Sequence, residues 1–434
     1  MSDPVSKIPR PLRNTGPKRM RKKRNSLIKV VLMLRIPGRA FTGLLIIVLL
    51  TLTGSLRTSF AASLAPRDRQ HAHNQFGNTF LPLTTFHLRG IDGPYHTQGN
   101  LILGADNHPY LFHGIARDDL EYFCKGDGHY DAKELAYLGP GNSTAKETYW
   151  GGNVVRLPLS EGFWLYGHPS ENCAPQQYQA LVKQTIDALT ALNMNVIINL
   201  QWTDAGGQAR GSGTQLAMPD ADSVAFWKQV APIYASYPNV LFELFNEPHI
   251  YNWVCWMNGC QVTGDVGTNN QTYSYPGVGM QKLVETVRSA GANNLVLVGG
   301  LDWGYDLSQL PTYHLQGTNI VYDTHPYDYY GKQPINWDAS FGNISSSYPV
   351  FAAEFGEYDC GTNYTSQLIN YFDAHNISWV GWAWVVAKAD SCAYPQVIST
   401  YNGTPIPGMG QWEYQHLQGY LALLVKAEVP EQKK

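Results

Sequence analysis

Two glutamates, Glu247 and Glu354, each lie at the end of an apolar run and are the residues of this chain best placed for chemistry. Glu247 closely follows the run Val240 to Phe245, and Glu354 ends the run that starts at Val350. A carboxyl group at such a place leaves the apolar interior where the chain reaches solvent, so its pKa can be tuned by its surroundings. Two carboxyl groups in one cleft supply the acid, base or nucleophile that cleavage of a glycosidic bond needs.

The elements that must position these glutamates are predicted from eight short apolar runs with helix-like segments between them. This alternation is typical of repeated βα units and a parallel sheet. Eight strands favour an α/β fold of the (β/α)8 TIM barrel type over a doubly wound sheet. In such a barrel the C-terminal strand ends form the ligand face, where residues of different strands can meet. The predicted strands are 111–115, 154–159, 196–200, 240–245, 295–298, 320–322, 350–354 and 379–384.

A basic and then apolar N-terminal segment predicts export. The first 62 residues hold 13 of the 31 Lys and Arg residues and a single acid, Asp3, and 17 uncharged residues lie between Arg39 and Arg57. Small residues at 61–63 allow cleavage as a signal peptide, but the apolar stretch is also just long enough for a membrane anchor. Both readings place the rest of the chain outside the cell, either secreted or anchored to the membrane.

The chain is therefore divided into five parts, and a small β-hairpin is predicted at the start of the barrel domain. The hairpin strands are expected at His87–Arg89 and Leu101–Leu103, with a turn at 104–107 after them. The parts are a basic cytoplasmic region (1–39), a signal peptide or signal-anchor helix (40–62), a linker (63–85), the barrel domain (86–424) and a charged tail (425–434).

Composition narrows the possible partners. Beyond residue 62 the chain carries 18 basic and 33 acidic side chains, which leaves no basic patch that would indicate nucleic acid binding. Twelve Trp and 27 Tyr residues suit stacking on sugars. The six cysteines agree with an oxidising compartment, and no Cys/His cluster has zinc spacing. Of 15 possible connectivities we prefer pairs of sequence neighbours, namely Cys124–Cys173, Cys255–Cys260 and Cys360–Cys392.

Four motifs, each at a predicted strand end, together resemble glycoside hydrolase family 5, and especially its secreted cellulase-like members in the clan of (β/α)8 retaining glycosidases. The resemblance extends over about residues 86 to 424. The motifs are Val154-Val155-Arg156-Leu157-Pro158, Asn246-Glu247-Pro248, His325-Pro326-Tyr327 and Glu354-Phe355-Gly356.

The resemblance implies a role for each motif residue. Glu247 matches the general acid/base and Glu354 the nucleophile of a reaction that uses no metal or cofactor. Arg156 matches an arginine near the nucleophile, where its charge favours the carboxylate; the alternative is a structural salt bridge. Asn246 matches the residue that binds the 2-hydroxyl of the sugar.

Aromatic and histidine side chains complete the predicted site. His325 and Tyr327 are two residues apart and so point to one side of a strand, towards the nucleophile or sugar hydroxyls. Trp382 matches the tryptophan that forms the floor of the cleaved subsite. Trp384 is the alternative, because residues two apart on a strand point to the same face. Trp202 is also predicted to bind substrate. We expect no more than half of the loop tryptophans to be sugar platforms; these are Trp150, Trp164, Trp202, Trp253, Trp256, Trp303 and Trp337.

Three other residues qualify this assignment. Glu243 and Glu357 lie near the predicted catalytic glutamates, but the first is expected in a buried hydrogen-bond network and the second in a loop. Gln201 stands where relatives have a histidine, so it can form hydrogen bonds but carries no charge.

The sequence thus predicts a monomeric, exported, retaining endo-β-glycosidase that acts on a polysaccharide or oligosaccharide, with β-1,4-glucan as the expected substrate. A β-mannanase or another β-glucanase remains open as an alternative, and so does a non-catalytic carbohydrate-binding barrel. Contact with a membrane is expected only through the N-terminal segment, if that segment is not cleaved.

Overall fold

The computed structural model describes residues 86–428 apart from five gaps. The chain divides into two units, Met1–Gly77 and Asn78–Lys434, and all described residues belong to the second. The predicted basic region, export segment and linker lie outside the described residues. Within the described part, no helix has both the length and the apolar character needed to cross a membrane. The gaps are 88–89, 209–213, 251, 360 and 387–393, and the side chains of 423–428 are also not described.

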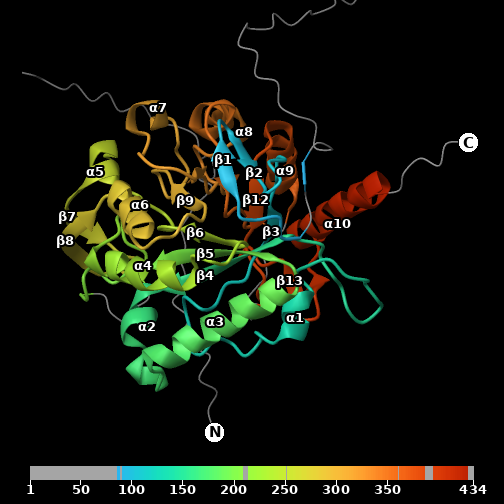
Figure 1. Ribbon diagram of the computed structural model, residues 1–434, viewed down its shortest axis with the longest axis horizontal. Coiled ribbons are helices and arrows are strands. Elements are labelled where there is room, and N and C mark those ends of the chain that lie inside the picture. The colour runs from blue at the N-terminus through green and yellow to red at the C-terminus, as the bar shows by residue number, and fades with distance from the viewer. Residues whose placement is uncertain are drawn as a thin grey trace, which may run out of the picture. The chain divides into compact units, whose positions relative to one another are not determined.

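Eight parallel strands close into a barrel (Figure 1). Going round the barrel from β3, each strand pairs with the next in chain order, and β12 returns to pair with β3. All eight predicted strands are present, so the predicted barrel is confirmed. The strands are β3 (His113–Ala116), β4 (Val154–Ser160), β5 (Asn195–Trp202), β6 (Val240–Glu243), β9 (Val296–Gly299), β10 (Ile320–Asp323), β11 (Val350–Ala352) and β12 (Ser378–Gly381).

The strands are apolar on both faces because each face is buried. Side chains such as Ile197, Leu241 and Leu297 fill the barrel interior, whereas Val196 and Val298 pack outwards against the helices. This burial of both faces explains why the strands read as continuous apolar runs and not as alternating ones. The larger part of the apolar core therefore lies between barrel and helices.

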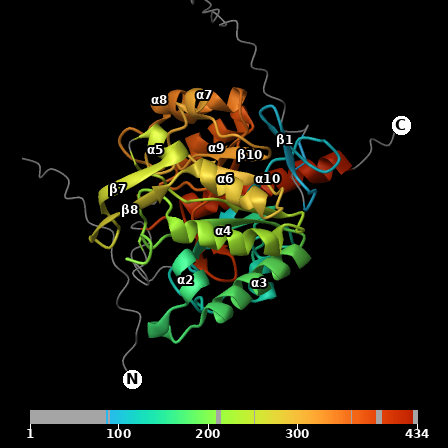
Figure 2. The same ribbon diagram turned by 60° about the vertical axis from the view of Figure 1, so that its left-hand side comes forward.

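Helices surround the barrel, and several have clear start signals. Asp220 caps α4 by accepting hydrogen bonds from the backbone N–H groups of Asp222 and Ser223, and Pro175 starts α3. Helix α4 packs beside α6 (Figure 2). The helices are α1 (Ala132–Ala136), α2 (Glu161–Tyr166), α3 (Pro175–Ala191), α4 (Ala221–Tyr234), α5 (Trp253–Asn258), α6 (Met280–Ser289), α7 (Leu310–Tyr313), α8 (Pro334–Trp337), α9 (Asn363–His375) and α10 (Met409–Glu428), with short turns of other helix types at Pro169–Glu171, Asp338–Gly342 and Ile344–Ser346.

The N-terminal hairpin exists, but it contains a strand that was not predicted. The strand β2 (Leu101–Leu103) pairs with β1 (His96–Gln98), and two residues of the predicted strand His87–Arg89 lie outside the described residues. The two strands are joined by Gly99 and Asn100, and Gly99 has a φ of 61°, which suits a two-residue hairpin turn. His87 forms only an isolated bridge to Tyr110.

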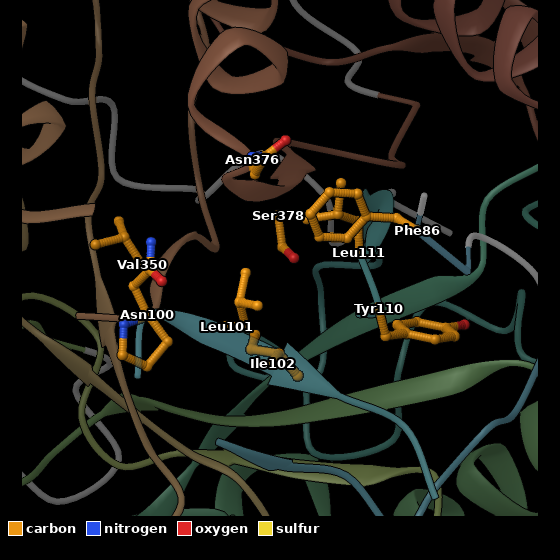
Figure 3. A pocket seen from close by; sticks show the side chains of 10 residues that line it. Phe86, Asn100, Leu101, Ile102, Tyr110, Leu111, Val350, Asn376 and Ser378 are labelled. Atoms are coloured by element: carbon orange, nitrogen blue, oxygen red, sulfur yellow. The ribbon is translucent and has the colours of Figure 1, made fainter. Parts of the chain in front are cut away.

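The hairpin lies at the N-terminal ends of the strands and borders a small pocket there. Ile102 of β2 and Tyr110 pack with the barrel interior. Figure 3 shows the pocket, which is lined mainly by apolar side chains. They come from the hairpin and from the start of β11, at Val350, and Ser378 lines it at the start of β12. No acid, base or histidine lines it. The residues that could do chemistry lie at the opposite, C-terminal end of the barrel.

Two further hairpins decorate the barrel. The longer one, β7 (Gly259–Val266) with β8 (Thr272–Val278), lies beside α5 in Figures 1 and 2 and is joined to it by the disulfide Cys255–Cys260. The shorter one pairs β13 (Ile398–Thr400) with β14 (Thr404–Pro405). A second disulfide links Cys124 and Cys173. Both predicted pairs are confirmed, and the third, Cys360–Cys392, lies outside the described residues.

Candidate active site

The two predicted catalytic glutamates meet above the C-terminal ends of the strands. Glu247 lies four residues beyond the end of β6, and Glu354 lies two residues beyond the end of β11. With His325, they place one ligand-type atom each within 4.8 Å of one another. A separation of 107 residues in sequence thus becomes a single pair of carboxyl groups, because β6 and β11 belong to one closed barrel.

Arg156 links the catalytic pair to the barrel interior. Its guanidinium group is fully buried and donates through Nη1 to Glu354 Oε2 at 2.9 Å and through Nη2 to Asn246 Oδ1 at 2.6 Å. The same group makes a two-point contact with Glu243, from Nε and Nη2, at 2.6 Å each. Asn199 donates a further hydrogen bond to Glu243. The expectation that Glu243 belongs to a buried network agrees with these contacts.

Glu354 receives two strong donors on its two oxygens. Tyr327 donates its hydroxyl to Oε1 at 2.6 Å, and Arg156 donates to Oε2. Both contacts favour the carboxylate form. Burial nevertheless raises the pKa of Glu354, and the positive charges of Arg156 and His325 oppose this effect without cancelling it.

Glu247 faces a histidine instead of an arginine. His325 Nδ1 lies 3.2 Å from Glu247 Oε1, and Gln215 donates its amide to Oε2 at 3.2 Å. Burial raises the pKa of Glu247, but the hydrogen bond and positive charge of His325 outweigh burial and hold that pKa below its ordinary value.

The orientation of His325 is set by an aspartate. Its Nε2 lies 3.0 Å from Asp323 Oδ2, and the other oxygen of Asp323 accepts from the backbone N–H of Ala353 at 2.8 Å. Burial lowers the pKa of His325, yet Asp323 first and Glu247 next raise it well above its ordinary value. An imidazole that donates through Nε2 has Nδ1 free to give a proton to Glu247 or to accept one from it. The opposite shifts of the two pKa values place the proton between these residues on His325.

The same cluster has the ligand types of a metal site, but its donors argue against one. Glu247, His325 and Glu354 lie close enough to share an ion. However, the guanidinium of Arg156 already contacts Glu354 at 2.9 Å, and Tyr327 occupies its other oxygen. A divalent cation there would face a fixed positive charge across a single carboxylate.

Trp382 and Trp202 lie at the same end of the barrel. The guanidinium of Arg156 lies 5.7 Å from the ring centre of Trp382, and Trp202 packs edge-on against Tyr122 at 4.5 Å. The prediction that Trp384 shares the face of Trp382 is wrong: Trp384 packs in the outer core, edge-on against Trp150. The strand β12 ends at Gly381, so the alternation of faces does not extend to residue 384.

The remaining candidate residues, Glu357, Gln201 and the loop tryptophans, differ in how far their side chains are buried. Glu357 is buried beyond Glu354, where it accepts from the backbone N–H of Tyr364. Gln201 is buried at the end of β5, and its Oε1 has no hydrogen-bond partner among the described residues. Of the loop tryptophans, those that keep some exposure are Trp202, Trp253 and Trp303, whereas those that are buried in packing are Trp150, Trp164, Trp256 and Trp337.

Three residues that touch or face this cluster were not predicted from the sequence. Asp323 precedes His325 by two residues, so the alternation that paired His325 with Tyr327 would also have found it. Lys332 is nearly buried and donates to the backbone oxygen of Asp302 at 2.7 Å, and its charge helps to lower the pKa of Glu247. Neither Lys332 nor Gln215 follows a strand end in a motif, so no signal in the sequence points to them.

Comparison with known proteins gives the same picture. A family model described as Cellulase (glycosyl hydrolase family 5) matches residues 141–388. An endoglucanase of Clostridium saccharobutylicum is 25% identical over 321 residues, which cover 72% of this chain but only 61% of that protein. An endoglucanase of Paenibacillus polymyxa is 23% identical over 339 residues, covering 68% of this chain and 80% of that protein.

Solved structures share the fold. A β-glucanase of Saccharophagus degradans aligns with a TM-score of 0.58 at 18% identity, covering 79% of this chain and 97% of that one. The catalytic domain of an endoglucanase of Thermobifida fusca aligns with a TM-score of 0.55 at 18% identity, covering 75% and 98%. At this identity the likeness concerns the fold alone. The family match, however, extends over more than half of the chain, and the chain therefore belongs to glycosyl hydrolase family 5.

Proposed function

We propose that the chain is a retaining endo-β-glycosidase that hydrolyses β-1,4-glucan. The observation that carries the proposal is the close approach of Glu247 and Glu354, within 4.8 Å in the same cluster as His325. Retaining enzymes hold their carboxyl groups about 5–5.5 Å apart, whereas inverting enzymes leave about 6.5–9.5 Å for a water molecule. The short separation favours the retaining mechanism.

In the first step Glu354 acts as nucleophile and Glu247 as general acid. The carboxylate of Glu354 attacks the anomeric carbon while the bond to the leaving oxygen breaks, and that oxygen takes the proton of Glu247. Arg156 and Tyr327 hold the attacking carboxylate. The proton needed on Glu247 comes from its pairing with His325, since the two residues hold one mobile proton between them.

In the second step Glu247 acts as general base. Once Glu354 is an ester its negative charge is gone, so Glu247, which has given its proton to the leaving oxygen, can remain ionised and act as a base. Glu247 then takes a proton from water, the resulting hydroxyl attacks the anomeric carbon, and Glu354 leaves as a carboxylate. The configuration at the anomeric carbon is inverted twice and thus retained.

Substrate binding is assigned to the residues around the pair. Asn246, held by Arg156, is proposed to bind the 2-hydroxyl, and Trp382 to form the floor of the cleaved subsite. Trp202 would stack on a neighbouring sugar. The names of relatives support glucan as the substrate: several are endoglucanases, and the β-glucanase of Saccharophagus degradans has a solved complex with cellotetraose.

We place the catalytic domain outside the cell, either secreted or anchored by the N-terminal segment. The two disulfides of the described part agree with an oxidising compartment. Within the same family a β-mannanase or another β-glucanase remains the alternative, because the catalytic set does not encode the sugar.

The variant Glu354→Ala tests the nucleophile. It should abolish hydrolysis with unchanged folding, and added azide should restore turnover and yield a glycosyl azide of inverted anomeric configuration. Glu357→Gln is the matched control, since it alters the next glutamate along the chain and should retain activity. Hydrolysis by Glu354→Ala at the wild-type rate would overturn the assignment.

A substrate panel separates the remaining readings. Cellulose derivatives, mannan, xyloglucan and β-1,3-glucan would be compared by release of reducing ends. Cleavage of the cellulose derivatives supports the proposal, whereas faster cleavage of mannan supports a β-mannanase. Binding without hydrolysis of any of the four would favour a non-catalytic carbohydrate-binding barrel.

A further inference from the structure

A hydrogen-bond chain leads from Trp382, which follows β12, to the buried side chain of Asp118, which follows the neighbouring strand β3. Trp382 Nε1 donates to the hydroxyl oxygen of Tyr394 at 2.9 Å, and Tyr394 donates to Asp118 Oδ2 at 2.6 Å. An indole N–H can only donate, so the oxygen of Tyr394 must accept at one end and give its single proton at the other. The chain therefore has one direction and ends on the carboxyl oxygen Oδ2 of Asp118.

Asp118 is held firmly at its end of the chain. It lies two residues beyond the end of β3, and only 2% of it is exposed. Its neighbour Arg117 points away, where it donates to Asp127 Oδ1 at 2.6 Å, and donates also to the backbone oxygen of Asp118. The aspartate thus has a fixed backbone and a fixed acceptor.

Tyr394 is fixed by the backbone around it. Ala383, the residue after Trp382, donates its N–H to the oxygen of Pro395 at 2.8 Å and accepts from the N–H of Val397 at 3.0 Å. The segment that carries Tyr394 is therefore docked directly alongside Trp382. The indole itself has its edge on Tyr394 and its face towards Arg156.

The same tyrosine is linked to the second predicted sugar platform. The hydroxyl groups of Tyr122 and Tyr394 interact, and the ring of Tyr122 packs edge-on against Trp202 at 4.5 Å. Trp382 is thus linked to Tyr394 directly, and Trp202 is linked to it through the ring of Tyr122.

We infer that Asp118 is a positioning residue that fixes the Trp382 indole through Tyr394 and so sets the position of the sugar in the cleaved subsite. The consequence for turnover rests on the proposed function. Small misplacements of a reacting sugar can cost about a hundredfold in rate, so loosening the indole lowers kcat. KM for long oligosaccharides changes little, because other subsites still bind the chain.

Three variants and a matched control test the role in turnover. Tyr394→Phe and Asp118→Ala should each lower kcat on cellohexaose about tenfold or more, whereas Asp118→Asn keeps an acceptor and should restore most of it. Tyr401→Phe is the control, because Tyr401 also donates to a carboxylate at 2.6 Å, on Asp127, without contact to Trp382. Equal losses in Tyr394→Phe and Tyr401→Phe would overturn the inference, as would Asp118→Asn being as slow as Asp118→Ala.

A double-mutant cycle tests whether Tyr394 acts through Trp382. The variant Trp382→Phe lacks the indole N–H, so adding Tyr394→Phe to it should cost nothing further. Additive losses would mean that Tyr394 acts by another route, because independent sites add.

A spectroscopic measurement separates this inference from the proposed function. The indole ¹H–¹⁵N resonance of Trp382, assigned by its loss in Trp382→Phe, should shift in Tyr394→Phe and Asp118→Ala and stay in place in Tyr401→Phe. This result does not depend on hydrolysis, so a chain that cleaves no glucan can still support the positioning role. An unshifted resonance in both variants overturns it, whatever the activity.

Discussion

Two clusters of carboxyl side chains, a central cluster and a β3 cluster, lie at the C-terminal end of the barrel. They differ in how many cationic side chains they contain. In the central cluster each of the four carboxyl groups contacts Arg156 or His325. In the β3 cluster Arg117 contacts the carboxylate of Asp127 alone. The central cluster consists of Glu243, Glu247, Asp323, Glu354, Arg156 and His325, and the β3 cluster of Asp118, Asp119, Glu121, Asp127 and Arg117.

The difference in cations changes the pKa values. In the β3 cluster burial raises the pKa of Asp118 to about 7, that of Asp119 to about 8 and that of Glu121 well above its ordinary value. In the central cluster burial also raises the pKa of Glu247, whose side chain is 11% exposed, but the hydrogen bond and charge of His325 outweigh burial and lower that pKa. Arg156 is shared by two carboxyl groups, and burial still raises the pKa of Glu354. Burial likewise raises the pKa of Glu243 to about 7, so contact with the shared Arg156 does not by itself lower the pKa of a buried carboxyl, whereas contact with His325 lowers that of Glu247.

The largest expected effect comes from removing the cation of each cluster. Arg156→Met leaves Glu243 and Glu354 buried without their partner, which should cost about 3–5 kcal/mol of unfolding free energy and abolish hydrolysis. Arg117→Met should cost less, about 1–3 kcal/mol, because Asp127 is 19% exposed and can be hydrated. Denaturant unfolding of both variants measures the difference. Equal costs would mean that the two clusters do not differ in the way described.

The second prediction concerns the mobile proton of the central cluster. Glu247→Gln should slow hydrolysis of β-1,4-glucan about 10²- to 10⁴-fold, because the leaving oxygen then receives no proton. Formation of the glycosyl-enzyme from an aryl glycoside with an acidic phenol needs little acid and should be nearly unaffected in burst kinetics. Asp119→Asn, in the β3 cluster, is the control and should retain the wild-type rate. Equal slowing of both bond types would exclude Glu247 as the acid.

The central cluster could be predicted from the sequence because its residues follow strand ends. Glu247 and Glu354 each follow an apolar run, and the parallel barrel brings all such ends together. Asp323 was missed only because the alternation from His325 was not followed backwards. The barrel itself was predicted for the same reason, since strands buried on both faces stand out as apolar runs.

The β3 cluster could not be predicted, because its contacts join distant loops. Asp118 and Tyr394 are 276 residues apart, and neither lies in a recognisable motif. Trp384 shows the limit of alternation: the rule of period two holds only while the strand continues, and β12 ends at Gly381. The strand β1 was not predicted for a local reason, since the turn signal at Gly99 and Asn100 is weaker than the later one at 104–107.

The smallest expected effect is a dependence of stability on pH that has opposite signs at Asp118 and Asp119 of the β3 cluster and at Glu247 of the central cluster. The native state keeps protons on Asp118 and Asp119 up to about pH 7 and 8, whereas the unfolded chain releases them near pH 4. Their contribution is therefore complete below pH 4 and is lost as pH rises to about 8, by at most about 1.4 kcal/mol per pH unit for each proton. Glu247 acts in the other direction, because its lowered pKa contributes stability that is lost on acidification.

Thermal unfolding between pH 5 and pH 8 would separate these contributions. We expect the wild type to lose stability towards pH 8 and Asp119→Asn to lose less, since its side chain cannot titrate. Glu247→Gln should keep the wild-type decline, because it leaves the β3 cluster untouched. If Asp119→Asn declined as steeply as the wild type, Asp119 would not hold its proton at neutral pH. The acids of the β3 cluster would then be charged although the cluster has a single arginine. In that case, burial with too few cations would not be the cause of a raised pKa in this cluster.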